Sequence, residues 1–178
     1  MTKSQAMDPY AEQPALFVPH GAPTFALRPG AAGAALVRQA GRRPRPRAII
    51  AVSAHWDTAV PTVGVAPRLD TIHDFSGFPR ELYELRYPAT GCPEAAHEVF
   101  TAIAEAGLPV AVDPVRGLDH GAWVPLRLMF PDADVPVVPL SIQPEAGPAH
   151  SLAVGHALEG LRARGVLLVA SGTLTHHL

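Results

Sequence analysis

The sequence is nearly without cysteine and lacks any long apolar run, and these two shortages narrow the kinds of protein it can encode. Cys92 is the only cysteine, so the chain cannot form an internal disulfide and its fold depends on packing or on a metal. No apolar stretch approaches the roughly 20 residues of a transmembrane helix, and residues 1–13 lack the apolar core of a signal peptide. We expect a cytoplasmic protein without a membrane partner, in which residues 1–13 form a flexible leader.

An excess of either charge is also absent. The 178 residues include 14 basic and 16 acidic side chains, for a formal net charge of −2, and 48% of them are hydrophobic. This balance offers no basic surface for nucleic acid or for an anionic membrane. The length and the apolar content suit one domain with a sizeable core, which we assign to residues 14–178.

Short apolar segments alternate with segments of helical periodicity. Six segments have the length and the β-branched content of strands: 14–18, 47–53, 61–65, 109–113, 135–142 and 165–171. Because these segments are mostly apolar rather than alternating, we expect both faces of each to be buried. Helical patterns occupy four segments: 31–41, 93–107, 121–130 and 148–165. Together they predict an α/β fold with a largely parallel or mixed central sheet and helices on both faces.

Four of the nine histidines follow the ends of predicted strands: His20, His55, His120 and His176. Side chains just beyond the carboxyl ends of parallel strands can meet in one crevice, so these four form a candidate site. A single histidine at a strand end could serve only to hydrogen-bond its loop. Four histidines in the same kind of position are less well explained by that structural role. Three other histidines lie inside helical patterns, where we expect surface or structural roles: His97, His150 and His156.

A cluster of imidazoles supports two kinds of chemistry. Neutral ring nitrogens bind metals such as Zn(II) and Fe(II), and an unligated histidine serves as an acid or a base near neutral pH. The long spacing between these histidines does not distinguish iron from zinc.

Six short motifs surround the candidate histidines. They are PHGAPT at 19–24, SAHW at 53–56, HDFSGFP at 73–79, LYELRYPATGCP at 82–93, LDHGAWVPL at 118–126 and SGTLTHHL at 171–178. In this order they resemble the motifs of the DOPA 4,5-dioxygenase-like proteins, which are class III extradiol ring-cleavage dioxygenases. The resemblance extends from about residue 15 to the last residue.

The resemblance implies a non-haem metal site that opens a small aromatic diol, a catechol, with O2. His20 and His55 match the family's two metal-binding histidines, and His120 matches a histidine of its pocket. His176 matches a histidine described either as an acid–base group near the metal or as a zinc ligand. We therefore expect His20, His55 and His176 as metal ligands and His176 and His120 as catalytic residues. Fe(II) would serve activity, and Zn(II) is an alternative bound metal.

Neighbouring residues complete the expected site. Segment 73–79 would be a substrate loop whose phenylalanines form apolar walls, although the same side chains also suit core packing. We assign substrate binding to four residues: His73, Phe75, Phe78 and Trp123. Asp57 and Asp119 are expected to accept hydrogen bonds from the imidazoles, and Asp74 is a further candidate.

Two features depart from the family pattern. His177 stands where the family usually has asparagine, and the chain stops at Leu178, whereas family members continue and supply another histidine. We expect a truncated chain whose remaining metal ligand lies beyond Leu178. An uncovered sheet edge would favour a homo-oligomer.

Two other functions stay open. One is a non-catalytic metal-binding or interaction protein of the same fold. The other is a zinc hydrolase in which His20, His55 and His176 activate water and His120 or Asp119 is the base. Oxygen consumption with catechols separates these functions from a dioxygenase. The sequence does not identify the catechol.

Overall fold

The computed structural model describes residues 10–173, and a six-stranded sheet forms its centre. The strands are β1 (Ala15–Val18), β2 (Ala48–Asp57), β3 (Thr62–Gly64), β4 (Ala111–Asp113), β5 (Val137–Ile142) and β6 (Val166–Ser171). Their order across the sheet is β1-β6-β2-β5-β3-β4. Each of the six predicted strands is present, and the sheet is mixed.

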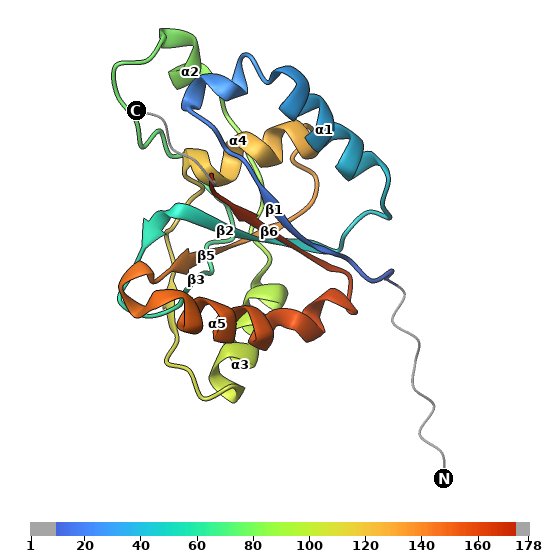
Figure 1. Cartoon of the computed structure of the whole chain (residues 1–178), viewed down its shortest axis with the longest axis vertical. Helices are drawn as coiled ribbons and strands as arrows, with labels where there is room; N and C mark the ends of the chain where they lie inside the picture. The colour runs from blue at the N-terminus through green and yellow to red at the C-terminus, as the bar shows by residue number, and fades with distance from the viewer. Residues whose placement is uncertain (1–9, 174–178) are drawn as a thin grey trace.

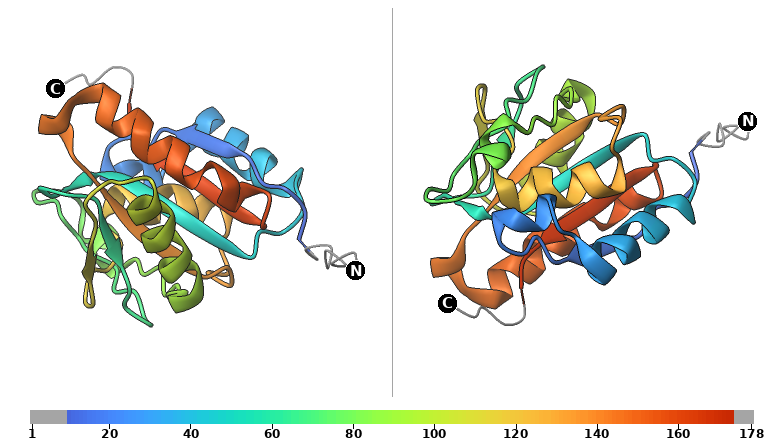
Figure 2. Two further views of the ribbon diagram at one scale, coloured as in Figure 1. Left: turned by 90° about the horizontal axis from the view of Figure 1, so that it is seen from below. Right: turned by 90° about the horizontal axis from the view of Figure 1, so that it is seen from above.

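Helices cover both faces of the sheet (Figures 1 and 2). One face carries η1 (Pro23–Ala26), α1 (Gly30–Gly41), α2 (Arg80–Glu84) and α4 (His120–Met129). The other face carries α3 (Pro93–Glu105), η2 (Pro144–Ala146) and α5 (Gly147–Arg162). The four predicted helices are confirmed, whereas α2 is too short to leave a periodic pattern. Among residues 10–173, no helix combines the length and the apolar character needed to cross a membrane.

The central strands contribute side chains to two separate cores. Ile49 and Ile50 are consecutive residues of β2, and both are completely buried. Ile49 packs in the core that includes residues of α1 and α4, and Ile50 packs in the core that includes residues of α3 and α5. Successive side chains of a strand point to opposite faces, so a sheet covered on both sides needs apolar residues at both positions.

The two outer strands of the described sheet contradict the prediction of burial on both faces. Phe17 in β1 is 62% exposed and Val112 in β4 is 52% exposed. Each of these strands has only one neighbouring strand in the sheet. Apolar composition alone therefore does not distinguish an outer strand from a central one.

The direction of β4 also differs from the prediction. β1, β6, β2 and β5 run parallel, but β3 pairs antiparallel with β5, and β4 runs parallel to β3. The carboxyl end of β4 therefore points away from the edge at which β1, β2 and β6 end. Residues 114–119 return the chain to that edge. Within them, Leu118 forms a parallel β-bridge with Thr71, which lies between β3 and α2.

Candidate metal centre

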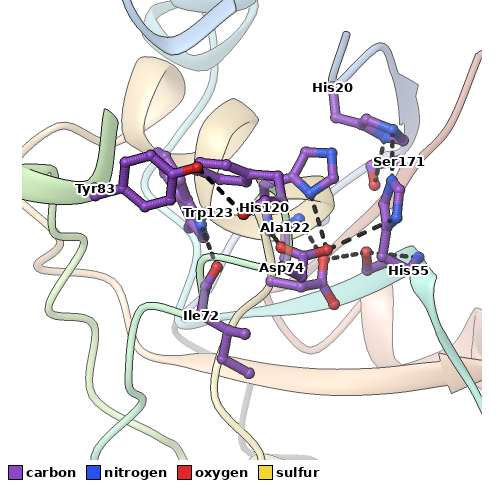
Figure 3. A network of polar contacts seen from close by, with 12 residues as sticks. His20, His55, Ile72, Asp74, Tyr83, His120, Ala122, Trp123 and Ser171 are labelled. Atoms are coloured by element: carbon purple, nitrogen blue, oxygen red, sulfur yellow. Dashed lines mark hydrogen bonds and ion pairs between the residues drawn. The ribbon is translucent and has the colours of Figure 1, made fainter. Parts of the chain in front are cut away.

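Three imidazoles from distant parts of the sequence meet at the carboxyl edge of β1 and β2 (Figure 3). His20 follows β1, His55 lies near the end of β2, and His120 is the first residue of α4. One ring nitrogen from each lies within 4.8 Å of those of the other two. The Nε2 atoms of His20 and His55 are 3.0 Å apart, and the ring centroids of His55 and His120 are 4.1 Å apart. The predicted approach of these three residues is confirmed.

An irregular stretch of β2 carries His55. Against β5, Val52 lies opposite Leu140 and Asp57 lies opposite Ile142, so five steps along β2 face two steps along β5. Extra residues of this kind bend a strand and redirect its side chains, and they are frequent beside functional sites. The strand thus continues beyond the predicted end at residue 53, and His55 lies within its irregular part.

His20 is buried and oriented by the neighbouring strand. Its Nδ1 lies 3.3 Å from the Oγ of Ser171, the last residue of β6, and only 6% of the residue is exposed. Burial, followed by the nearby imidazoles of His55 and His120, lowers the pKa of His20 from 6.5 to about 4. The ring is therefore neutral at physiological pH, which is the form that binds a metal.

Asp74 orients His120. Its Oδ2 lies 2.9 Å from Nδ1 of His120, and its Oδ1 accepts a hydrogen bond of 2.8 Å from the backbone N–H of the same residue. Burial raises the pKa of Asp74, but the hydrogen bonds from His120 outweigh it and lower the pKa from 3.8 to about 2. An ionised carboxylate only accepts, so Nδ1 carries the proton and a neutral His120 has its lone pair on Nε2.

Of the three aspartates considered from the sequence, Asp74 is the one that contacts imidazoles in the described residues. Its Oδ2 also lies 3.8 Å from Nδ1 of His55. Asp57 is exposed, and its carboxylate has no hydrogen-bond or ion-pair partner within residues 10–173. Asp119 is buried but bonds Ser53 and Arg116 instead of an imidazole. The expectation of a direct hydrogen bond to an imidazole is therefore wrong for Asp57 and Asp119 in this part of the chain.

The loop at 73–79 places aromatic side chains against His120. The ring centroid of Phe75 is 5.7 Å from that of His120, 5.5 Å from that of Phe78 and 5.2 Å from that of Tyr83. Phe75 and Phe78 are half-buried and pack on the core below α1 and α4. Their positions therefore suit both interpretations, a wall beside the site and a part of the core.

Two of the residues assigned to substrate binding, Trp123 and His73, have their ring nitrogens next to backbone carbonyl groups of the protein. Trp123 is completely buried, and its Nε1 donates a 3.0 Å hydrogen bond to the carbonyl of Ile72. No surface of this side chain is left for a substrate, so direct contact is not supported, and Trp123 fixes the base of the 73–79 loop. The Nε2 of His73 lies 3.1 Å from the carbonyl oxygen of Leu85, and its ring contacts Phe75.

A cavity of about 600 Å³ also borders His20 and His55. Residues of β1, β2, β5, β6 and α5 form its mostly apolar lining, which includes Phe17 but neither Phe75 nor Phe78. Its polar residues include Ser141 and Gln143, which share a hydrogen bond of 3.0 Å. The volume falls in the range of about 300–1,000 Å³ typical of small-molecule sites.

Sequence reasoning missed the serines beside the site. Ser53 and Ser171 are buried polar residues, and Ser171 contacts His20. The available signal was that a serine closes the apolar run of 47–53 and that of 165–171. His176 and His177 lie outside the described residues 10–173.

Comparison with known proteins shows similarity to ring-opening dioxygenases. Residues 16–178 match the family described as the catalytic LigB subunit of aromatic ring-opening dioxygenase. The chain is 43% identical over 164 residues to the 4,5-DOPA dioxygenase extradiol of Beta vulgaris, covering 90% of this chain and 61% of that protein. It is 42% identical over 166 residues to the 4,5-DOPA dioxygenase extradiol of Escherichia coli K12, covering 93% of this chain and 60% of that protein.

A solved structure shows the same fold. The crystal structure of an uncharacterized protein from Escherichia coli K12 superimposes with a TM-score of 0.73 and 35% sequence identity, covering 93% of this chain and 62% of that chain. The present chain thus spans about three fifths of the length of these relatives.

Proposed function

The chain belongs to the family of catalytic LigB subunits of aromatic ring-opening dioxygenases, and from this premise we propose that it serves the extradiol cleavage of a catechol by O2. The observation that carries the proposal is the convergence of His20, His55 and His120, with ring nitrogens within 4.8 Å of one another. We propose His20 and His55 as ligands of a non-haem metal. His176 is proposed as a further ligand or as an acid–base group.

The donor atoms suit such a metal. Imidazole nitrogens bind both Fe(II) and Zn(II), and burial keeps His20 in the neutral form that ligation requires. We propose Fe(II) for activity and Zn(II) as an alternative occupant, because zinc has no redox chemistry. When bound, iron(II) would supply open coordination positions for both reactants and a path for electrons from the catechol, which is the reductant, to O2.

We propose that His120 contacts the substrate and acts as a general base. Asp74 holds the Nδ1–H of His120, so Nε2 is the atom that would accept a proton from a catechol hydroxyl. The ionised carboxylate of Asp74 would then stabilise the protonated ring. The carboxylate therefore sets both the tautomer and the orientation of the proposed base.

Oxygen uptake tests the proposed function. The iron-loaded chain, mixed anaerobically with a catechol and then exposed to O2, is expected to consume oxygen and to form a yellow ring-opened semialdehyde. The zinc-loaded chain is the matched control and should do neither. Iron binding without oxygen uptake for any catechol would contradict the proposal and favour a non-catalytic metal-binding protein, whereas ester hydrolysis by the zinc-loaded chain would favour a hydrolase.

A pair of phenylalanine variants tests where the aromatic ring of the substrate lies. We propose that Phe75, beside His120, forms one wall of the catechol site. Phe75→Ala is expected to raise the KM for catechol about 3- to 10-fold, because an aromatic contact contributes about 0.5–1.5 kcal/mol. Phe17→Ala, in the cavity that borders His20 and His55 but not Phe75, is the matched control and should leave KM unchanged. The reverse pattern would place the substrate in that cavity.

A further inference from the structure

A buried carboxylate joins the segment that carries His55 to the helix that carries His120. Asp119 precedes α4 and is 2% exposed, and its Oδ1 accepts a hydrogen bond of 3.3 Å from the backbone N–H of Ala122. The same Oδ1 accepts a hydrogen bond of 2.5 Å from the Oγ of Ser53 in β2. Ser53 Oγ in turn accepts a hydrogen bond of 3.1 Å from the backbone N–H of His55. One carboxylate oxygen thus connects the start of α4 to the amide of His55.

The second oxygen of Asp119 is also occupied. Arg116 Nη2 donates to Oδ2 over 2.5 Å, and the guanidinium lies 4.8 Å from the centroid of the Trp56 ring. The Nε of Arg116 is buried and has no hydrogen-bond partner in the described part of the chain. A buried donor without a partner is unfavourable, so this ion pair is poorly explained as a stabilising contact alone. It does hold the carboxylate in a single orientation.

The backbone of α4 lies directly against this link. A Cβ at Gly121 would come within 2.4 Å of Ser53 Oγ, 2.9 Å of His55 Cδ2 and 3.1 Å of Asp119 Oδ1. Only glycine leaves room for so close an approach. The separation between the two elements is therefore determined by the hydrogen bonds of Asp119 and Ser53 and not by an intervening side chain.

We propose that Asp119, held by Arg116 and linked through Ser53, is a positioning residue that sets the distance between the imidazoles of His55 and His120. This inference rests on the proposed function, because it assumes that the clustered imidazoles bind a metal. Asp74 orients the ring of His120 directly, whereas Asp119 acts on the backbone that presents both rings. Its removal should alter metal geometry even where the helix start is retained.

Titration with Co(II) alone tests this role, because the visible absorption of cobalt reports its coordination geometry. Asp119→Ser keeps a good helix-capping side chain but lacks the second oxygen that binds Arg116. It is expected to weaken Co(II) binding about 10- to 100-fold and to change the cobalt spectrum, as usual for residues that orient ligands. Ser53→Ala, which leaves the cap and Arg116 in place, should cause a similar spectral change. Asp132→Ser, at an exposed aspartate, is the control and should behave as wild type.

Thermal unfolding of the metal-free variants separates positioning from stability. Asp119→Ala should unfold at a lower temperature than Asp119→Ser, while both bind Co(II) weakly. Wild-type affinity and spectrum in Asp119→Ser and Ser53→Ala would overturn the inference and leave the proposed function standing. A wild-type chain that takes up no Co(II) would contradict the proposed function and, with it, this inference.

Discussion

Replacing His20 or His55 with alanine is expected to weaken the binding of Zn(II) or Co(II) by more than about 100-fold, because residues that merely orient ligands already contribute about 10- to 100-fold. The Nε2 atoms of these residues lie 3.0 Å apart, and His20 is held neutral, so each variant removes a nitrogen that is ready to bind. Isothermal titration calorimetry measures the loss directly.

His156→Ala is the matched control for these variants. His156 lies on α5 with 69% of its side chain exposed, its Nδ1 lies 3.8 Å from Oε2 of Glu159, and it is not one of the three histidines that cluster. Its replacement should leave metal binding unchanged. Metal should also raise the unfolding temperature of the wild type and of this control, because it binds only the folded chain, but not that of the His20 or His55 variant. Stoichiometric metal in both alanine variants would refute their assignment as ligands.

Replacing His120 with glutamine is expected to lower the turnover of the iron-loaded chain by about 10²–10⁴ while leaving iron bound, the range usual for the loss of a general acid or base. Glutamine fills a similar space but cannot exchange a proton near neutral pH. Asp74→Asn should reduce turnover less, by about 10- to 100-fold, because it removes the charge that orients and stabilises the ring. Oxygen uptake after anaerobic loading with catechol measures both effects.

The metal content of the same variants decides which histidine has which role. If His120→Gln loses its iron, His120 is a ligand, in keeping with its position within 4.8 Å of the nitrogens of His20 and His55. His176→Ala provides the complementary measurement. Retained iron with lost turnover would make His176 the principal base, as the family resemblance implies. Lost iron would make His176 a ligand, and the acid–base role would then belong to His120.

Much of the arrangement followed from local patterns. Apolar runs of strand length predicted all six strands, and helical periodicity predicted α1, α3, α4 and α5. The ends of these runs marked His20 and His55, because a strand in a covered sheet must become polar where it leaves the core. The same argument selected His120 and His176, and the motif match supported all four. For His20, His55 and His120 the predicted convergence is confirmed.

The tertiary structure alone decided the direction of β4 and the identity of the orienting carboxylate. An apolar run has the same composition in a parallel and in an antiparallel strand. The prediction that the carboxyl end of β4 lies at the same edge as those of β1, β2 and β6 was therefore wrong. Asp57 and Asp119 each lie within two residues of a candidate histidine, yet neighbours along a strand or at a helix start point in different directions. The carboxylate that meets His120 comes from Asp74, 46 residues away, through a loop that only long-range packing brings to the site.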